Sequence, residues 1–274
     1  MSWFRRSLHV LSLGVLSLAA SPLGCEAPAT APPVASSAPV TPPALAPSAV
    51  QHGARVAAGI RYLVRYTGGA RADQQLPMVV AIHGLGDRPE RFAGLLAGLE
   101  QPARLIVPQG LDPYHGGFSW FPIRVADQDP EAIAQGMRRA AARLADMLTE
   151  LGKRHPTEGK PVVTGFSQGG MLSFALAVEH PQVVAAAIPL AGWLPPPMWP
   201  STVPAQAPPI VALHGDADPL LTIQPTRDAV RQLRQAGFAV ELHEYPGVRH
   251  TVSPAMRRQL YRQLAPLLVG RATP

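Results

Sequence analysis

Short apolar runs alternate along most of the chain with longer segments in which apolar residues recur at helical spacing. The short runs predict strands at Ile60–Tyr66, Met78–Ile82, Arg104–Pro108, Val162–Gly165, Val184–Leu190, Ile210–Leu213 and Ala239–Tyr245. The longer segments predict helices near Arg91–Leu99, Pro130–Leu151, Gly169–Glu179, Pro225–Ala236 and Pro254–Leu268. This alternation is typical of an α/β fold, in which a mostly parallel central sheet carries helices on both faces.

The chain before the first predicted strand has a different composition. Arg5 and Arg6 precede the apolar stretch Leu8–Ala20, which is too short to span a bilayer and has the layout of a secretory signal. We interpret residues 1–25 as a signal peptide and residues 26–52, rich in Pro and Ala, as a disordered tether. Residues 53–274 then form the α/β domain.

Cys25 is the single cysteine of the chain and follows Pro22-Leu23-Gly24. A Gly-Cys pair at the end of a signal resembles a bacterial lipobox, in which the cysteine is acylated, although Pro22 stands where leucine is usual. We expect an exported bacterial protein attached to a membrane through lipidated Cys25. Cleavage after residues 27–29 would instead give a secreted or periplasmic protein. A single cysteine excludes an internal disulfide.

The formal net charge of +6 comes almost entirely from arginines. Many of them fall at helical spacing within predicted helices, which indicates a solvated face. No nucleic-acid-binding motif, metal-ligand spacing or phosphate-binding loop accompanies them. We therefore expect no metal, no cofactor and no nucleic-acid partner.

A Gly-x-Ser-x-Gly sequence joins the predicted strand at Val162 to the predicted helix ending at Glu179. It reads Gly165-Phe166-Ser167-Gln168-Gly169-Gly170 and has the form of a nucleophile elbow, in which small residues permit a tight strand-to-helix turn. The N-terminus of the following helix would direct unpaired N–H groups and a partial positive charge at a developing oxyanion. Ser167 is therefore the candidate nucleophile.

A serine nucleophile needs a histidine base and an acid that orients it. Asp216 and Asp218 follow the strand predicted at Ile210–Leu213, and either could be the acid; His250 follows the strand predicted at Ala239–Tyr245. Carboxyl ends of parallel strands gather catalytic groups at one edge of a sheet, so these residues should meet Ser167.

The predicted strand Met78–Ile82 is followed by His83-Gly84-Leu85-Gly86-Asp87, whose glycines allow a close backbone approach. We assign the oxyanion-hole donors as the backbone N–H groups of Leu85 and Gln168. His83 and His214 each precede a glycine at a strand end, and we expect them to brace their loops by hydrogen bonding.

With Trp120-Phe121 and Leu190-Ala191-Gly192-Trp193-Leu194-Pro195, these motifs resemble the phospholipase/carboxylesterase family of α/β-hydrolases, which includes acyl-protein thioesterases. The resemblance covers residues 61–268. It implies an α/β-hydrolase fold and a serine esterase that acts on carboxylic esters or thioesters without a cofactor, and it favours Asp218 over Asp216 as the acid. The sequence departs from the family pattern at two places: Pro122 stands where the family commonly has aspartate, and a proline-rich insertion follows Leu194. These departures leave the identity of the acyl group undetermined.

We therefore expect a serine carboxylic-ester hydrolase that forms an acyl-enzyme and acts on a small-molecule or lipid-like ester. Trp120, Phe121 and Trp193 are candidates for an apolar substrate pocket, or are simply core. The alternatives are a lysophospholipase, an acyl thioesterase and a surface-tethered binding protein on a hydrolase scaffold.

Overall fold

The computed structural model describes residues 55–122, 129–155 and 157–269. The predicted signal peptide (residues 1–25) with Cys25, and the predicted tether (residues 26–52), lie outside these ranges. Within the described ranges, no helix combines the length and apolar character that crossing a membrane requires.

An eight-stranded sheet with the order β1-β2-β4-β3-β7-β8-β9-β10 forms the centre of the domain. All neighbours from β4 to β10 pair in parallel, whereas β2 runs antiparallel to both β1 and β4. This confirms the mostly parallel sheet. The strands are β1 (Arg55–Ala57), β2 (Ile60–Thr67), β3 (Met78–Ile82), β4 (Ala103–Pro108), β7 (Val162–Phe166), β8 (Ala186–Leu190), β9 (Ile210–Gly215) and β10 (Val240–Tyr245).

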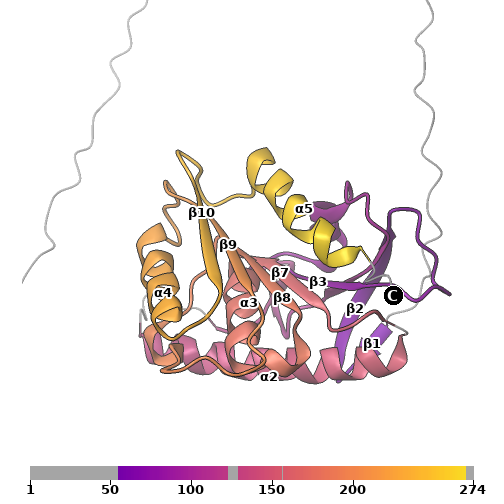
Figure 1. The fold of residues 1–274 in the computed structure, drawn as a ribbon, viewed down its shortest axis with the longest axis horizontal. Helices are drawn as coiled ribbons and strands as arrows, with labels where there is room; N and C mark the ends of the chain where they lie inside the picture. The colour runs from indigo at the N-terminus through magenta and orange to yellow at the C-terminus, as the bar shows by residue number, and fades with distance from the viewer. Residues whose placement is uncertain (1–54, 123–128, 156, 270–274) are drawn as a thin grey trace, which may run out of the picture. The chain divides into compact units, whose positions relative to one another are not determined.

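The two faces of the sheet carry separate apolar clusters. Alternate residues of β3 divide between them: Met78, Val80 and Ile82 enter one cluster, whereas Val79 and Ala81 enter the other. The first face packs on α2, α3 and α4, and the second on α1 and α5 (Figure 1). Helices therefore cover both faces, as predicted. They are α1 (Pro89–Phe92), α2 (Pro130–Arg154), α3 (Gln168–Glu179), α4 (Ile223–Gln235) and α5 (Pro254–Leu268).

The structure corrects the helix predicted at Arg91–Leu99. α1 ends at Phe92 and continues as the 3₁₀ turn η1 (Ala93–Leu96), because Gly94 and Gly98 lower the helix propensity of this segment. Two further 3₁₀ turns, η2 (Pro181–Val183) and η3 (Pro196–Met198), begin at prolines. η2 occupies the chain just ahead of β8, which begins at Ala186 and not at Val184.

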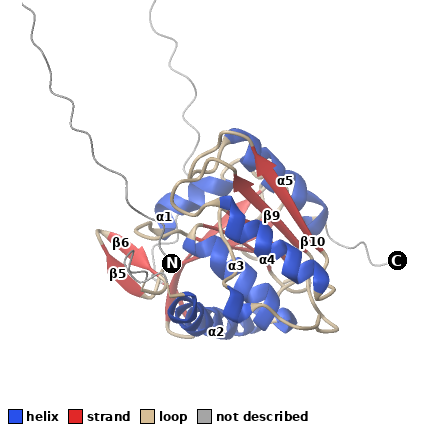
Figure 2. Cartoon of the chain, turned by 90° about the vertical axis from the view of Figure 1, so that its left-hand side faces the viewer, coloured by secondary structure: helices blue, strands red, loops and turns tan. Residues whose placement is uncertain are grey.

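A two-stranded hairpin of β5 (Asp112–Tyr114) and β6 (Gly117–Ser119) was not predicted, nor was the three-residue strand β1. Figure 2 shows the hairpin outside the main sheet. Its turn residues His115 and Gly116 have φ values of 41° and 80°, as a tight hairpin turn requires. Strands of three residues carry too little alternation to be recognised in a sequence.

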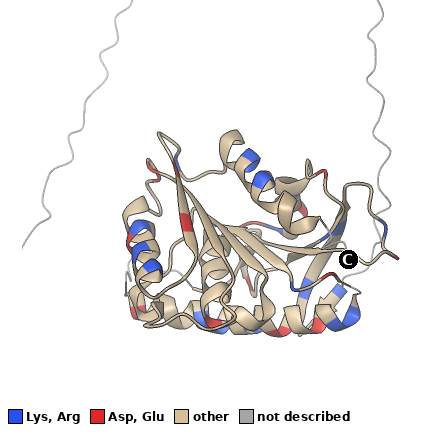
Figure 3. Cartoon of the chain, viewed as in Figure 1, with Lys and Arg blue, Asp and Glu red and all other residues tan. Residues whose placement is uncertain are grey.

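On α2 and α4, basic residues lie beside acidic ones, whereas α5 carries basic residues alone (Figure 3). On α2, Arg138 pairs with Glu131 and with Glu179 of α3, and on α4, Arg231 pairs with Asp228. These pairs support the expectation of solvated helix faces.

Candidate active site

Ser167 occupies a strained turn between β7 and α3. Its φ of 58° and ψ of −116° lie outside the regions that residues with a Cβ ordinarily adopt. The turn is fixed by two backbone hydrogen bonds, from Ser167 N–H to Leu190 O (3.0 Å) and from Met171 N–H to Ser167 O (2.9 Å). The strand-to-helix elbow expected from the sequence is therefore present.

Close packing of α3 against β3 requires glycine at two positions of this turn. A Cβ on Gly169 would lie 1.9 Å from Ile82 O, and one on Gly165 would lie 2.5 Å from the carbonyl carbon of Gly169. Either side chain would push the helix away from the sheet, and Ser167 with it.

Ser167, His250 and Asp218 are hydrogen bonded in series at the carboxyl edge of the parallel strands. His250 Nε2 lies 3.0 Å from Ser167 Oγ, and His250 Nδ1 lies 2.6 Å from Asp218 Oδ2. Phe166 packs against the imidazole with ring centroids 4.7 Å apart. The structure brings the three predicted residues together, and their catalytic roles stay a prediction.

The protonation of Asp218 sets the tautomer of His250. Burial alone would raise the pKa of Asp218, but hydrogen bonds from His250 and from the N–H groups of Leu221 and Leu220 outweigh it and hold that pKa below its ordinary value. An ionised carboxylate only accepts hydrogen bonds, so His250 Nδ1 carries the proton and Nε2 is free to accept the Ser167 hydroxyl.

Asp216, the alternative acid, is placed elsewhere. Its Oδ1 accepts a hydrogen bond from Gly247 N–H (2.7 Å) and so closes a turn between β10 and His250. The structure brings Asp218, and not Asp216, to His250.

The two assigned N–H donors flank Ser167. Gly84 packs directly against it, since a Cβ on Gly84 would lie 3.3 Å from Ser167 Cβ. Gln168 is the first residue of α3, where an N–H has no partner inside the helix. In the part of the chain that the structure describes, neither Leu85 N–H nor Gln168 N–H donates to an acceptor. Their assignment as oxyanion-hole donors stays a prediction.

The hairpin β5–β6 anchors the Leu85 loop. Gly86 N–H donates to Phe118 O (2.9 Å), and Phe118 N–H donates to Asp87 O (3.0 Å). Sequence reasoning missed this anchor because it missed the hairpin.

The side chain of Gln168 is held by the Trp120-Phe121 segment. Gln168 Oε1 accepts from Trp120 N–H (3.1 Å), and Gln168 Nε2 donates to Phe121 O (2.9 Å). Both aromatic side chains are buried, with 1% and 2% of their surface exposed. The segment thus fixes the residue beside Ser167, a role that nothing in the sequence indicated.

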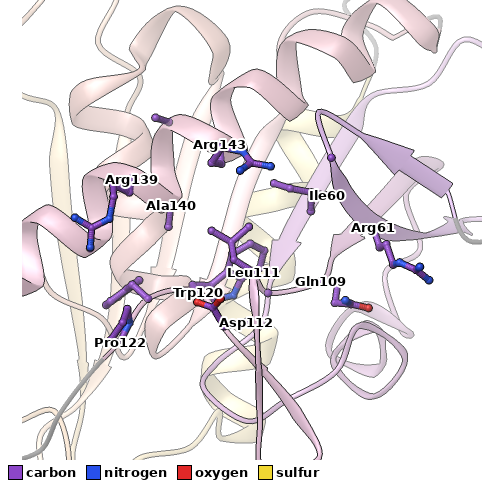
Figure 4. Close-up of a pocket in the computed structure, with 15 residues that line it drawn as sticks. Ile60, Arg61, Gln109, Leu111, Asp112, Trp120, Pro122, Arg139, Ala140 and Arg143 are labelled. Carbon is purple, nitrogen blue, oxygen red and sulfur yellow. The ribbon is translucent and has the colours of Figure 1, made fainter.

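Trp120 and Phe121 also line a cavity of about 700 Å³, with Arg139 and Arg143 of α2 forming part of its wall (Figure 4). None of Ser167, Asp218 and His250 lines this cavity. Trp193 is half-buried and packs against the apolar cluster under α2, α3 and α4. Substrate binding by Trp120, Phe121 and Trp193 therefore stays a prediction.

A second histidine lies beneath Asp218. His214 Nε2 lies 3.4 Å from Asp218 Oδ2 and donates to Leu221 O (2.8 Å). On the other side of the ring, Thr226 Oγ1 lies 2.9 Å from both His214 Nδ1 and Gly192 O. Burial lowers the pKa of His214 even though Leu221 O and Asp218 favour its charged form. A neutral His214 thus braces this loop, as expected, while its contact with Thr226 of α4 had no sequence signal.

Within residues 55–122, 129–155 and 157–269, no group of three or more His, Cys, Asp or Glu side chains is placed to hold a metal ion. A mechanism without metal or cofactor stays a prediction.

Comparisons with known proteins place this chain in a family. The sequence model of the Phospholipase/Carboxylesterase family matches residues 69–267. Three solved structures share the fold: esterase PE8 (22% identity, 74% of this chain and 100% of that chain covered, TM-score 0.64), Zea mays acyl-protein thioesterase 2 (23%, 75% and 98%, 0.60) and the Bacillus cereus carboxylesterase (16%, 76% and 94%, 0.63). At such identities the structures establish the α/β-hydrolase fold alone, whereas the family match covers most of the chain. The chain therefore belongs to the phospholipase/carboxylesterase family of α/β-hydrolases.

Proposed function

We propose that the protein is a serine carboxylic-ester hydrolase that works through an acyl-enzyme intermediate. The observation that carries the proposal is the series from Ser167 Oγ through His250 to Asp218, with contacts of 3.0 Å and 2.6 Å. Membership of a family of esterases supports the same chemistry.

In the first half-reaction, Ser167 Oγ attacks the ester carbonyl while His250 Nε2 takes the hydroxyl proton. Asp218 holds the Nδ1–H tautomer and stabilises the imidazolium. The N–H groups of Leu85 and Gln168 bind the oxyanion of the tetrahedral intermediate. The intermediate collapses as His250 returns the proton to the leaving alkoxide, which gives the acyl-enzyme and an alcohol.

In the second half-reaction, His250 removes a proton from water, and the resulting nucleophile attacks the acyl carbonyl. The same two N–H groups bind the second oxyanion. Ser167 then leaves with the proton from His250, which releases the carboxylic acid and restores the site.

Two exposed apolar side chains close to the proposed catalytic groups support an ester with an apolar part. Leu85 and Leu220 are 37% and 72% exposed, and each is next to a group of the proposed mechanism. Leu85 supplies one oxyanion donor, and the N–H of Leu220 binds Asp218 (2.9 Å). Apolar side chains at these positions suit an acyl chain or a lipid-like ester.

The proposal is tested by treating the purified full chain and its Ser167→Ala variant with a fluorophosphonate probe, and by assaying p-nitrophenyl esters of increasing chain length. We expect labelling and hydrolysis by the wild type and loss of both in the variant. An acyl-coenzyme A and a lysophosphatidylcholine in the same assay test the thioesterase and lysophospholipase alternatives. A variant that keeps its activity would remove Ser167 from the mechanism, and an inert wild type would favour the binding-protein alternative.

We also propose that Cys25 is lipidated and attaches the exported protein to a membrane. The support is the Gly24-Cys25 pair that follows the apolar stretch Leu8–Ala20. Growth of a bacterial host with an alkyne fatty acid should label the wild type but not Cys25→Ser. A protein released unlabelled into the periplasm or medium would contradict the anchor.

A further inference from the structure

We propose that His83 is a positioning residue that turns the Gly84–Leu85 peptide so that the Leu85 N–H faces the oxyanion at Ser167. The inference rests on the proposed esterase function. It goes beyond it by assigning a role to a buried side chain that does not touch the reacting atoms.

Both nitrogens of His83 are engaged by backbone groups. Nδ1 lies 2.7 Å from Gly84 O, and Nε2 accepts a hydrogen bond from Gly110 N–H (3.0 Å). An N–H donor opposite Nε2 leaves that nitrogen unprotonated, so the proton must be on Nδ1. The ring is fully buried, and burial lowers its pKa, which agrees with a neutral imidazole.

The carbonyl of Gly84 sets the direction of the next N–H. The Gly84–Leu85 peptide is trans, so its C=O and N–H point in opposite directions. Gly84 O is held by His83 Nδ1–H and, at the longer distance of 3.2 Å, by Asp87 N–H. With the carbonyl turned toward His83, the Leu85 N–H must point away from it.

Gly84 is packed against the turn that carries Ser167. A Cβ on Gly84 would approach Ser167 Cβ to 3.3 Å and Phe166 O to 3.2 Å, so the peptide is already against the turn that carries the nucleophile. Trp120 contacts both the backbone and the ring of His83. Trp120 Nε1–H donates to His83 O (3.0 Å), and the two rings lie 5.3 Å apart.

Two substitutions separate orientation from packing. His83→Asn places an amide N–H near the position of Nδ1, where it can still donate to Gly84 O. His83→Gln places its amide near the position of Nε2, where it can accept from Gly110 N–H but cannot reach back to Gly84. The two residues differ by one methylene and are both neutral, so each is the control for the other.

We expect His83→Gln to lower kcat about tenfold to a hundredfold with little change in KM, because the donor acts mainly on the oxyanion. His83→Asn should recover most of this loss. Phosphonylation by the fluorophosphonate probe, which also develops charge on an oxygen at Ser167, should slow in the same order. Urea unfolding of both variants measures the loss of stability separately.

Equal losses of kcat in the two variants, or losses that follow the unfolding free energy, would show a packing role and overturn the inference. So would full kcat in His83→Gln. An active wild type with unaffected variants would refute only the role of His83, whereas a wild type without turnover or labelling would refute the esterase proposal and the inference with it.

Discussion

His250 and the pair His83 and His214 lie at the same edge of the sheet in opposite environments. The side chain of His250 is 14% exposed, and its Nε2 faces Ser167 Oγ. His83 and His214 are fully buried, and both nitrogens of each ring contact groups of their own loops or of an adjoining segment. Burial lowers the pKa of both.

This difference shows what makes a histidine useful for proton transfer. His250 uses one nitrogen to bind Asp218 and offers the other to the group that must lose a proton. In His83 and His214, both ring nitrogens already have partners, so neither is available to a substrate. Burial also disfavours the charged form of each ring. Their contribution is to the geometry of the loops that carry Leu85 and Asp218.

The largest effect should follow from His250→Gln. Glutamine places its amide near Nε2, so it loses the hydrogen bond from Nδ1 to Asp218 and cannot take the Ser167 proton; kcat should fall roughly 10³-fold or more. The unfolding free energy should fall by about 1–3 kcal/mol, because the buried Asp218 carboxylate loses one of its hydrogen-bond partners. Steady-state kinetics on a short p-nitrophenyl ester and urea unfolding measure the two quantities. A kcat within about tenfold of wild type would show that His250 is not the general base. His250 would then not differ in function from His83 and His214.

A smaller loss should follow from Asp218→Asn. An amide N–H facing His250 Nδ1 favours the wrong tautomer, so we expect kcat to fall about 10²- to 10⁴-fold. Asp216→Asn is the matched control, because asparagine can still accept from Gly247 N–H and should leave kcat nearly unchanged. Equal losses in the two variants would contradict the assignment of Asp218.

The fold could be predicted where strands are long and buried. β3 appears in the sequence as an unbroken apolar run and β4 as an apolar run that contains Arg104, and the parallel order follows from the helices between strands. The hairpin β5–β6 could not be predicted, since its partner contacts are made by Gly86 and Asp87 of another loop. The helix predicted at Arg91–Leu99 was wrong because the prediction relied on the helical spacing of apolar residues and gave too little weight to Gly94 and Gly98.

The candidate site also has a part that the sequence predicts and a part that it does not. The turn at Ser167 and the loops of Asp218 and His250 have local signatures, and strand order brings them together. The support of the site has no such signature. Gln168 meets Trp120 across 48 residues, and His214 meets Thr226 of α4. Such contacts depend on the packing of separate elements, which a single sequence does not encode in its spacing.

His214→Gln should affect stability more than chemistry. The substitution places an amide near Nε2, where it can still donate to Leu221 O, but it leaves the buried Thr226 Oγ1 without its contact to Nδ1, which we expect to cost about 1–3 kcal/mol of unfolding free energy. The loss in kcat should be far smaller than for His250→Gln. His243→Gln is the control, because His243 is 36% exposed on β10 and should change stability by about 0.5 kcal/mol or less. A stability change no larger than in this control would mean that His214 does not brace the Asp218 loop.

The smallest effect should appear in the pH dependence of stability. Burial lowers the pKa of His83 and of His214 below the ordinary value of 6.5, so the unfolded chain binds protons at pH values where the native protein still holds both rings neutral. Their stabilising contribution is therefore complete above about pH 6.5 and is lost as pH falls through the lower native pKa values. Urea unfolding between about pH 7.5 and pH 5 should show a steeper loss of free energy in the wild type than in His214→Gln. Equal slopes would indicate that His214 accepts its proton as readily in the folded protein as in the unfolded chain, and the contrast with His250 would then rest on contacts alone.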